Sequence, residues 1–448
     1  MEMPPKDVRK AEADIMIVLS SKSHLTGLQV FNELKGIESL YREIGKPGGG
    51  KIYLSNKAND SFLRLVGAVG EYLPSRDFVG RDDIYRACKT VVGALCEEGA
   101  RKLDAQSFIN AAEKIIAATI QPHRFYTTLD GMHFEDFTEL EVGRLSIHKS
   151  DLTILQKSEA HQKTRDSLWR GMGEALWITG EITGSHKECE RIFFENVKLA
   201  CGLLTLSLAM AGEWGVVGQR LAPCMDTRSR PSTSSWFSIA TESKQLCAST
   251  SWGGNSLQRL EKKFVSDLLE RDWFQNLIGI LQGDGKSDVE QAIQRGVYWY
   301  FDAQMDTSLE MQMVKFWSCI ECIFSFMNDG QTTKSIRNGM VGMFILGGYR
   351  LVDEKEMTSL RSQIKALYEL RCGAVHDAKH NHVSQRDVAL VSKWAAWVMI
   401  EVAGLAVAGF KTRKEIKIQT DYWFEKLQGQ LTPTAEKCPT CGSRITQS

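Results

Sequence analysis

The sequence predicts an α+β N-terminal region followed by an all-α helical bundle. Three observations support this fold class. Apolar residues recur at helical spacing early in the chain, strand-like alternation appears in the middle, and long amphipathic patterns return beyond residue 256. With 448 residues and 43% hydrophobic composition, the chain can bury a large core, and we expect two or three domains.

The first region, residues 1–120, is predicted to be mainly helical, because residues 8–44 and 60–120 carry apolar positions three and four residues apart. Between these stretches, GKPGGGKI (45–52) matches the first part of a phosphate-binding loop. It ends in Ile52, where magnesium binding needs Ser or Thr, and it follows a helix and leads into a strand, the reverse of the usual order. We therefore interpret it as a hairpin turn.

The second region, residues 121–280, is predicted to mix helices and strands and to act as a sensor or regulatory domain. Strand-like alternation covers FYTTLDGMHFEDFTELEVGRLSIH, ALWITGEITGS and FSIATESKQLCAST, and a helix is expected at 189–211. Small polar residues and a proline at 227–235 indicate an exposed loop.

The third region, residues 281–430, is predicted to be a bundle of helices with faces rich in Leu, Ile, Val, Trp and Phe. Asp288 stands where it could cap the first of them. The expected helices cover residues 288–304, 309–328, 333–347, 355–372 and 384–410. The remaining residues, 431–448, form a C-terminal tail.

Composition limits the partners and the compartment. Lys+Arg and Asp+Glu are 55 each, so contact with nucleic acid requires a local basic patch. No stretch approaches twenty uninterrupted apolar residues, and the N-terminus is charged where a signal peptide needs an apolar core. The eleven cysteines have no disulfide-type spacing. We expect a cytoplasmic protein that does not interact with membranes.

One pair of residues carries candidate chemistry. Of the nine histidines, His376 alone has an arginine five to seven residues before it, which is Arg371 in RCGAVH. An amphipathic helical pattern precedes the pair and a long apolar one follows it. Without further context, a salt bridge at a helix end and a satisfied core histidine are the favoured explanation of the pair.

The segment ALYELRCGAVHD resembles the R-x4-6-H signature of HEPN domains, particularly the ApeA-like group. VYWYFDAQ (297–304) and VKFWSCIECIF (314–324) are similar to the aromatic and glutamate-containing segment that precedes the signature in that group. The resemblance covers roughly residues 288–410. It implies a HEPN-like bundle, a homodimer, and a prokaryotic antiphage defence or toxin effector that cleaves RNA, including tRNA, in response to a phage-derived trigger.

The implied activity is that of a metal-independent endoribonuclease, with no cofactor for catalysis. RNA supplies its own nucleophile, the 2′-hydroxyl, so a proton acceptor and a charge clamp suffice. His376 can transfer protons near neutral pH, and the planar fork of Arg371 can hold the scissile phosphate. The expected product ends in a 2′,3′-cyclic phosphate.

Three nearby residues modify this hypothesis. Five helical residues rotate Arg371 and His376 about 140° apart, so we expect a break near Gly373, which is a poor helix former. Cys372 departs from the polar residue usual after the arginine in the family. Glu321, inside an apolar helical pattern, is a third candidate catalytic residue, a buried acid that orients Arg371 or His376.

Several cysteines and histidines are candidate metal ligands. Cys438 and Cys441 have the spacing of half a structural zinc site, which would need further ligands from a dimer mate or from His380 and His382; a reducible tail is the alternative. Cys319 and Cys322 share this spacing, but their apolar surroundings favour core packing. His376 and His380, four residues apart, could instead ligate a metal from one helical face.

A basic segment follows the last long apolar helical pattern. KTRKEIK (411–417) is expected to extend the last helix, and its Lys411, Arg413 and Lys414 are candidate contacts to the RNA backbone. The alternative to a nuclease is a catalytically silent HEPN-like dimerisation or RNA-binding module, in which Cys372 marks the loss of activity.

Overall fold

The computed structural model divides into two compact units, and each is described by itself. The first comprises Met1–Arg124, Glu181–Phe193 and Ile239–Gln245, and the second comprises Phe125–Gly180, Phe194–Ser238 and Leu246–Ser448. The residues that the structure describes are 3–27, 29–30, 34, 41–211, 220–226, 234–251, 258–283, 286–325, 332–380 and 382–429.

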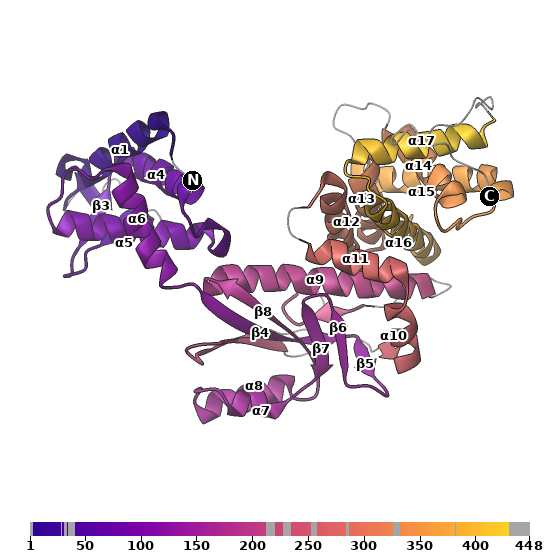
Figure 1. Cartoon of the computed structure of the whole chain (residues 1–448), viewed down its shortest axis with the longest axis horizontal. Helices are drawn as coiled ribbons and strands as arrows, with labels where there is room; N and C mark the ends of the chain where they lie inside the picture. The colour runs from indigo at the N-terminus through magenta and orange to yellow at the C-terminus, as the bar shows by residue number, and fades with distance from the viewer. Residues whose placement is uncertain are drawn as a thin grey trace. The chain divides into compact units, whose positions relative to one another are not determined.

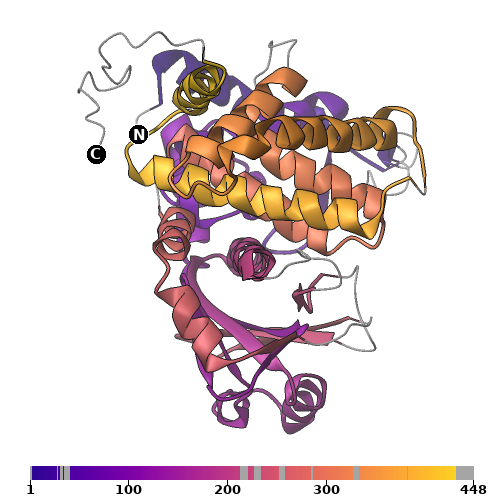
Figure 2. The same cartoon turned by 90° about the vertical axis from the view of Figure 1, so that its right-hand side faces the viewer.

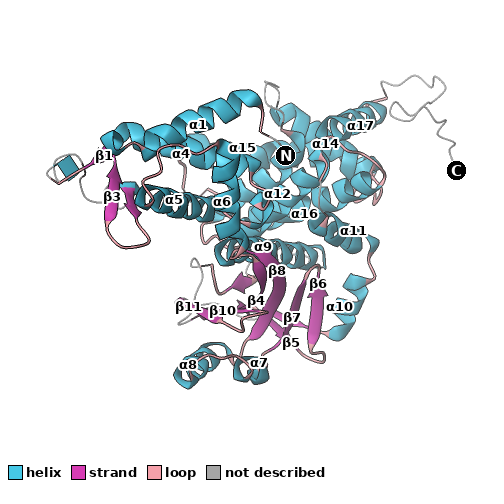
Figure 3. Ribbon diagram, turned by 60° about the vertical axis from the view of Figure 1, so that its left-hand side comes forward, coloured by secondary structure: helices cyan, strands magenta, loops and turns pink. Residues whose placement is uncertain are grey.

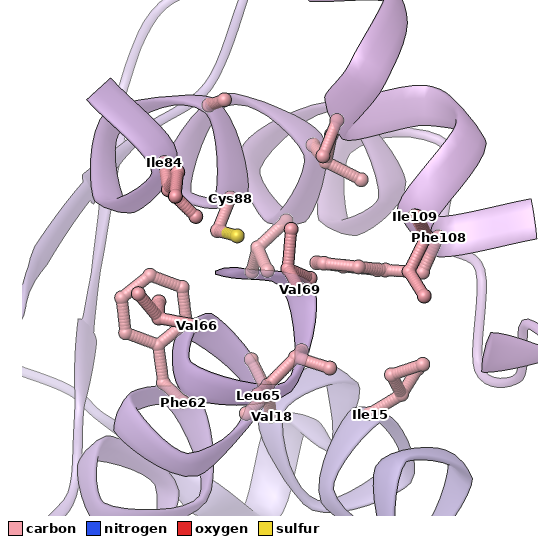
Figure 4. Close-up of a cluster of buried hydrophobic side chains, with 14 of the residues drawn as sticks. Ile15, Val18, Phe62, Leu65, Val66, Val69, Ile84, Cys88, Phe108 and Ile109 are labelled. Atoms are coloured by element: carbon pink, nitrogen blue, oxygen red, sulfur yellow. The ribbon is translucent and has the colours of Figure 1, made fainter. Parts of the chain in front are cut away.

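The first unit packs four helices beside a small antiparallel sheet with strand order β1-β3-β2. Side chains from all four helices meet in one apolar core, in which Phe62 and Phe108 are fully buried (Figure 4). The helices are α1 (Pro5–Leu19), α4 (Asn56–Tyr72), α5 (Arg81–Glu97) and α6 (Ala105–Ala117), with the 3-10 turns η1 (Ser21–Ser23) and η2 (Arg76–Phe78) and the strands β1 (His24–Leu25), β2 (Glu43–Gly45) and β3 (Lys51–Leu54).

The glycine-rich loop of this unit is a hairpin turn, as predicted. Strands β2 and β3 pair antiparallel, with Gly45 opposite Lys51. Gly49 and Gly50 have φ of +99° and +85°, values that glycine adopts without steric cost. The loop therefore joins two strands and does not open a helix, so the geometry of a nucleotide-binding loop is absent from it.

A seven-stranded sheet contains most of the strands, in the order β11-β10-β4-β8-β7-β6, with β9 paired to β4. Helix α9 lies between this sheet and the helical bundle (Figures 1 and 2). The strands are β4 (Gln121–Asp130), β6 (Glu139–Val142), β7 (Leu145–Lys149), β8 (Leu176–Gly184), β9 (Ala222–Pro223), β10 (Ser234–Ala240) and β11 (Leu246–Ser251); β5 (Met132–Phe134) and β12 (Gln258–Leu260) form a separate parallel pair, and the helices are α7 (Leu152–Gln156), α8 (Gln162–Met172) and α9 (His186–Ala211).

The C-terminal part of the second unit is helical, so the predicted order of an α+β region followed by helices is confirmed (Figure 3). A β-carbon on Gly202 of α9 would lie 2.6 Å from the carbonyl oxygen of Val297, so this helix and the bundle approach closely. The helices are α10 (Lys262–Leu269), α11 (Asp272–Gln282), α12 (Asp288–Gln304), α13 (Leu309–Phe324), α14 (Thr332–Leu346), α15 (Met357–His376), α16 (Gln385–Val407) and α17 (Arg413–Leu427), with the 3-10 turn η3 (Glu354–Glu356).

Two sequence-based expectations about the bundle are wrong. Ser287, not Asp288, caps α12, because its hydroxyl accepts from the backbone N–H of Glu290 and Glu290 reaches back in a capping box. The segment 411–417 does not extend the preceding helix. Helix α16 ends at Val407, and a new helix, α17, begins at Arg413 with Thr412 as its cap.

Two helices among the described residues are long and apolar enough to cross a membrane, His186–Met210 and Gln385–Val407. In each, 72% of the most apolar window is buried inside the protein. Such burial is typical of core helices in soluble proteins, and both helices pack against other elements of the second unit.

Candidate functional site

The predicted arginine and histidine lie on one uninterrupted helix. Helix α15 runs from Met357 to His376 through Gly373, so the break expected there is absent. Gly373 serves close packing instead: a β-carbon at this position would lie 3.3 Å from Nε2 of His382 and 3.3 Å from Cδ of Lys379. The glycine makes room for the segment that returns past the helix.

Arg371 points into the bundle and is held by helix α13. Its Nη2 atom donates to Oε2 of Glu321 at 3.0 Å, and the two side chains are 16% and 17% exposed. Tyr368, one turn earlier on α15, donates from its hydroxyl to the other oxygen of Glu321 at 3.2 Å. Of the two partners expected for Glu321, the structure pairs it with Arg371, and Tyr368 donates a further hydrogen bond to it.

Aromatic rings support this cluster of Glu321, Tyr368 and Arg371. The guanidinium of Arg371 lies over the ring of Tyr368, with 5.6 Å from Cζ to the centroid. Trp317, fully buried on α13, meets the same ring edge-on at 5.1 Å. These contacts restrict the rotamers of Tyr368 and Arg371, so the guanidinium has a defined position.

Burial sets the protonation behaviour of the cluster. It raises the pKa of Glu321, against the attraction of Arg371 and the hydrogen bonds from Tyr368 and Arg371. Burial and the nearby Glu321 charge raise the pKa of Tyr368 to about 12, so the phenol remains a donor. Nε of Arg371 is buried and has no hydrogen-bond partner among the described residues. One donor of the guanidinium is thus unused.

His376 lies apart from the cluster of Glu321, Tyr368 and Arg371. It is exposed in the last turn of α15, five residues and about 140° around the helix from Arg371. In the described part of the chain, no hydrogen bond or ion pair joins His376 to Arg371 or Glu321. A single chain therefore brings Arg371 and Glu321 together and leaves His376 on a different side of the helix.

One residue near the motif was missed by the sequence analysis, and another was given a different role. Tyr368 could have been found, because residues three apart on a helix are neighbours and Tyr368 precedes Arg371 by three. His382 was considered only as a zinc ligand. Its Nε2 lies 3.0 Å from the carbonyl oxygen of Leu370, which fixes the segment after α15 against the helix.

The basic segment 411–417 contains an arginine that is bonded to other parts of the bundle and two exposed lysines that were predicted to bind RNA. Arg413 donates through Nε to Asp288 at 3.1 Å and 3.2 Å, and through Nη1 to the carbonyls of Cys322 and Ser325. Its donors connect α12, α13 and α17, which leaves it poorly placed to bind RNA. Lys411 and Lys414 are exposed. These two lysines remain candidate contacts to a polyanion.

No group of three or more His, Cys, Asp or Glu side chains within the described ranges could hold a metal ion. His376 and His380 do not share a helical face, because α15 ends at His376 and Ala378 has a φ of +49°. Cys319 is fully buried in α13, as expected of a core residue. Cys438 and Cys441 lie outside the described residues, so the zinc site stays a prediction.

Comparison of the chain with protein-family models, with curated proteins and with solved structures finds no match. The HEPN resemblance therefore rests on the motif residues themselves.

Proposed function

We propose that this chain is a metal-independent endoribonuclease of the HEPN type. The observation that supports it best is the pairing of a restrained arginine with an exposed histidine on one helix. Arg371 is held by its ion pair with Glu321 and lies over the ring of Tyr368, and His376 is open to solvent five residues later. A fixed cation and an accessible proton carrier are the two groups that cleavage by the 2′-hydroxyl requires.

In the proposed reaction, the 2′-oxygen attacks the adjacent phosphorus while its proton passes to an imidazole. The bond from phosphorus to the 5′-oxygen breaks, and that oxygen takes a proton from an imidazolium. The products are a 2′,3′-cyclic phosphate and a free 5′-hydroxyl. Arg371 offsets the negative charge that accumulates on the phosphoryl oxygens in the transition state.

The separation of the two side chains favours a site shared by two copies of the chain. Because Arg371 and His376 diverge by about 140°, one copy does not direct both groups at the same phosphate. Across a two-fold axis, Arg371 of one copy would work with His376 of the second. The functional form we propose is a homodimer with composite sites.

The test is cleavage of total tRNA in EDTA by the full chain, with detection of 2′,3′-cyclic ends. Arg371→Ala and His376→Ala should each lower the rate by about 10²–10⁴-fold, the range for loss of acid–base or charge-stabilising groups. His380→Ala, an exposed histidine four residues on, is the matched control and should cleave normally. Wild-type cleavage rates and unchanged growth toxicity in both site variants would contradict the proposal.

Mixing the two inactive variants tests the composite site. If the sites are shared, a dimer of one Arg371→Ala chain and one His376→Ala chain holds one intact site. Random exchange should then restore about a quarter of wild-type activity, because half of the dimers are mixed and each has one of two sites. No recovery, with exchange verified by differently tagged chains, would place both groups in one chain.

A second candidate function is a catalytically silent HEPN-like module that dimerises or binds RNA. It is favoured by the engagement of Arg371 with Glu321 and by Cys372, a weak hydrogen-bonding group beside the arginine. This module would bind tRNA without cleaving it. Under either function, the resemblance implies a role in antiphage defence, which a plaque assay with and without His376→Ala would test.

A further inference from the structure

Two arginines outside the Arg371 and His376 site lie in the bundle, on helices α14 and α15. Arg337 is half-buried on α14, and Arg361 is half-buried on α15. Neither guanidinium has an ion pair or hydrogen bond among the described residues, and Nε of Arg337 is buried without a partner. Buried donors of this kind are uncommon in native structures, and each one needs an explanation.

The two cations repel each other. Burial lowers the pKa of Arg337, and the charge of Arg361 lowers it further. Two like charges in a partly desolvated place destabilise the fold unless an anion lies between them. The same turns of α14 also contain Ser335 Oγ and Asn338 Oδ1, and neither buried atom has a hydrogen-bond partner within the described ranges. Unsatisfied polar atoms are thus concentrated in this part of α14.

The guanidinium of Arg361 is restrained in a way that leaves its N–H donors available. Its guanidinium lies over the ring of Phe424 on α17, with 5.5 Å from Cζ to the centroid. An aromatic contact on its face restrains a guanidinium and leaves the in-plane N–H donors available. These donors form the planar fork that matches two oxygens of a phosphate.

We propose that Arg337 and Arg361 bind a phosphate group, and that this group is a phosphodiester of the RNA substrate. The RNA assignment rests on the proposed function. Arg361 and Arg371 are ten residues apart on α15, so the two positions are separated by about 15 Å along one helix. A phosphate at Arg337 and Arg361 would hold a flanking segment of the RNA that Arg371 and His376 cleave.

The experiment compares Arg337→Gln, Arg361→Gln and the double variant with Arg386→Gln, which removes an exposed arginine of α16. Binding of tRNA to the full chain is measured by fluorescence anisotropy in EDTA over a range of salt concentrations. The double variant should bind about tenfold more weakly, and its salt dependence should lose about one unit of slope for each arginine. Arg386→Gln should bind like wild type.

Melting temperature separates this site from a structural role. Since Arg337→Gln removes a repulsion, it should melt at or above the wild-type temperature while binding tRNA less tightly. Inorganic pyrophosphate should raise the melting temperature of wild type and of Arg386→Gln, and should not raise that of the double variant. A fall in the melting temperature of Arg337→Gln with unchanged tRNA affinity would overturn the proposal.

The remaining outcomes distinguish the sources of the phosphate. If the arginine variants lose the pyrophosphate response but bind tRNA normally, the ligand is a free phosphate compound and the RNA assignment is wrong. If wild-type protein neither binds nor cleaves tRNA, the proposed function fails, and the pyrophosphate response alone decides whether a phosphate site exists. If the double variant matches wild type in both assays, no such site exists.

Discussion

Two glutamates of the bundle are enclosed by apolar helices and have different partners. Glu401 of α16 is 3% exposed, and its carboxylate accepts from the backbone N–H groups of Gly348 and Tyr349, each at 2.9 Å. In the part of the chain that the structure describes, Glu321 of α13 accepts from two side chains, those of Tyr368 and Arg371. Burial raises the pKa of both carboxyl groups.

The difference in partners implies a difference in role. A carboxylate bound to backbone amides fixes the course of the chain, here the turn after α14, where a β-carbon on Gly347 would lie 2.7 Å from Oε2 of Glu401. A carboxylate bound to an arginine and a tyrosine fixes the position of those two side chains. We therefore assign Glu401 to stability and Glu321 to positioning Arg371.

The largest expected effect concerns activity. Glu321→Ala should lower the kcat of tRNA cleavage by about 100-fold, because a displacement of a catalytic group by about 1 Å has this effect. KM should change little if Arg371 contributes mainly in the transition state. Glu321→Gln keeps one acceptor oxygen and should recover part of the rate. Glu401→Gln is the control.

This prediction is checked by steady-state kinetics at a temperature where all variants are folded. A loss of kcat in Glu401→Gln as large as that in Glu321→Ala would remove the distinction between the two residues. A rise in KM alone for Glu321→Ala would assign Glu321 to substrate binding.

The second expected effect concerns the free energy of unfolding, which should fall more in Glu401→Ala than in Glu321→Ala. Glu401→Ala leaves two backbone N–H groups without their acceptor and should lower the free energy of unfolding by about 1–3 kcal/mol. Glu321→Ala should cost less, about 1 kcal/mol, because the long side chain of Arg371 can turn toward water. Urea unfolding followed by circular dichroism measures both. Equal losses would contradict the assignment.

The two glutamates also indicate what the sequence can predict. Each is an acid inside an apolar helical pattern, so each can be recognised as buried and paired. The sequence narrowed the partner of Glu321 to Arg371 or His376, because these two had already been singled out by their spacing, and the structure pairs Glu321 with Arg371. The partner of Glu401 is the backbone more than 50 positions earlier in the chain, and no side-chain pattern encodes such a contact.

The limits of the helices also show which features the sequence can predict and which it cannot. The prediction of 288–304 matches α12 because a clear apolar period marks it, although the cap is Ser287 and not the predicted Asp288. The prediction of a helix break at Gly373 was wrong. The sequence does not distinguish a glycine that allows close packing from a glycine that ends a helix. Its neighbour His382 lies nine residues on and becomes visible only in three dimensions.

The smallest expected effect is on the pH dependence of stability. In both glutamates the folded-state pKa lies above the ordinary value of 4.5, so the folded protein binds the proton more tightly than the unfolded chain. Their contribution to the free energy of unfolding is therefore full below pH 4.5 and is lost as the pH rises through the raised pKa.

Replacement by glutamine removes this titration. The difference in unfolding free energy between wild type and Glu401→Gln should shift against wild type as the pH rises from 4 toward neutrality, and Glu321→Gln should show the same sign. For Glu321, the attraction of Arg371 opposes burial, whereas the amides at Glu401 are uncharged. A difference that grows in favour of wild type with rising pH would mean that pairing outweighs burial, and Glu321 would then be an ionised clamp on Arg371.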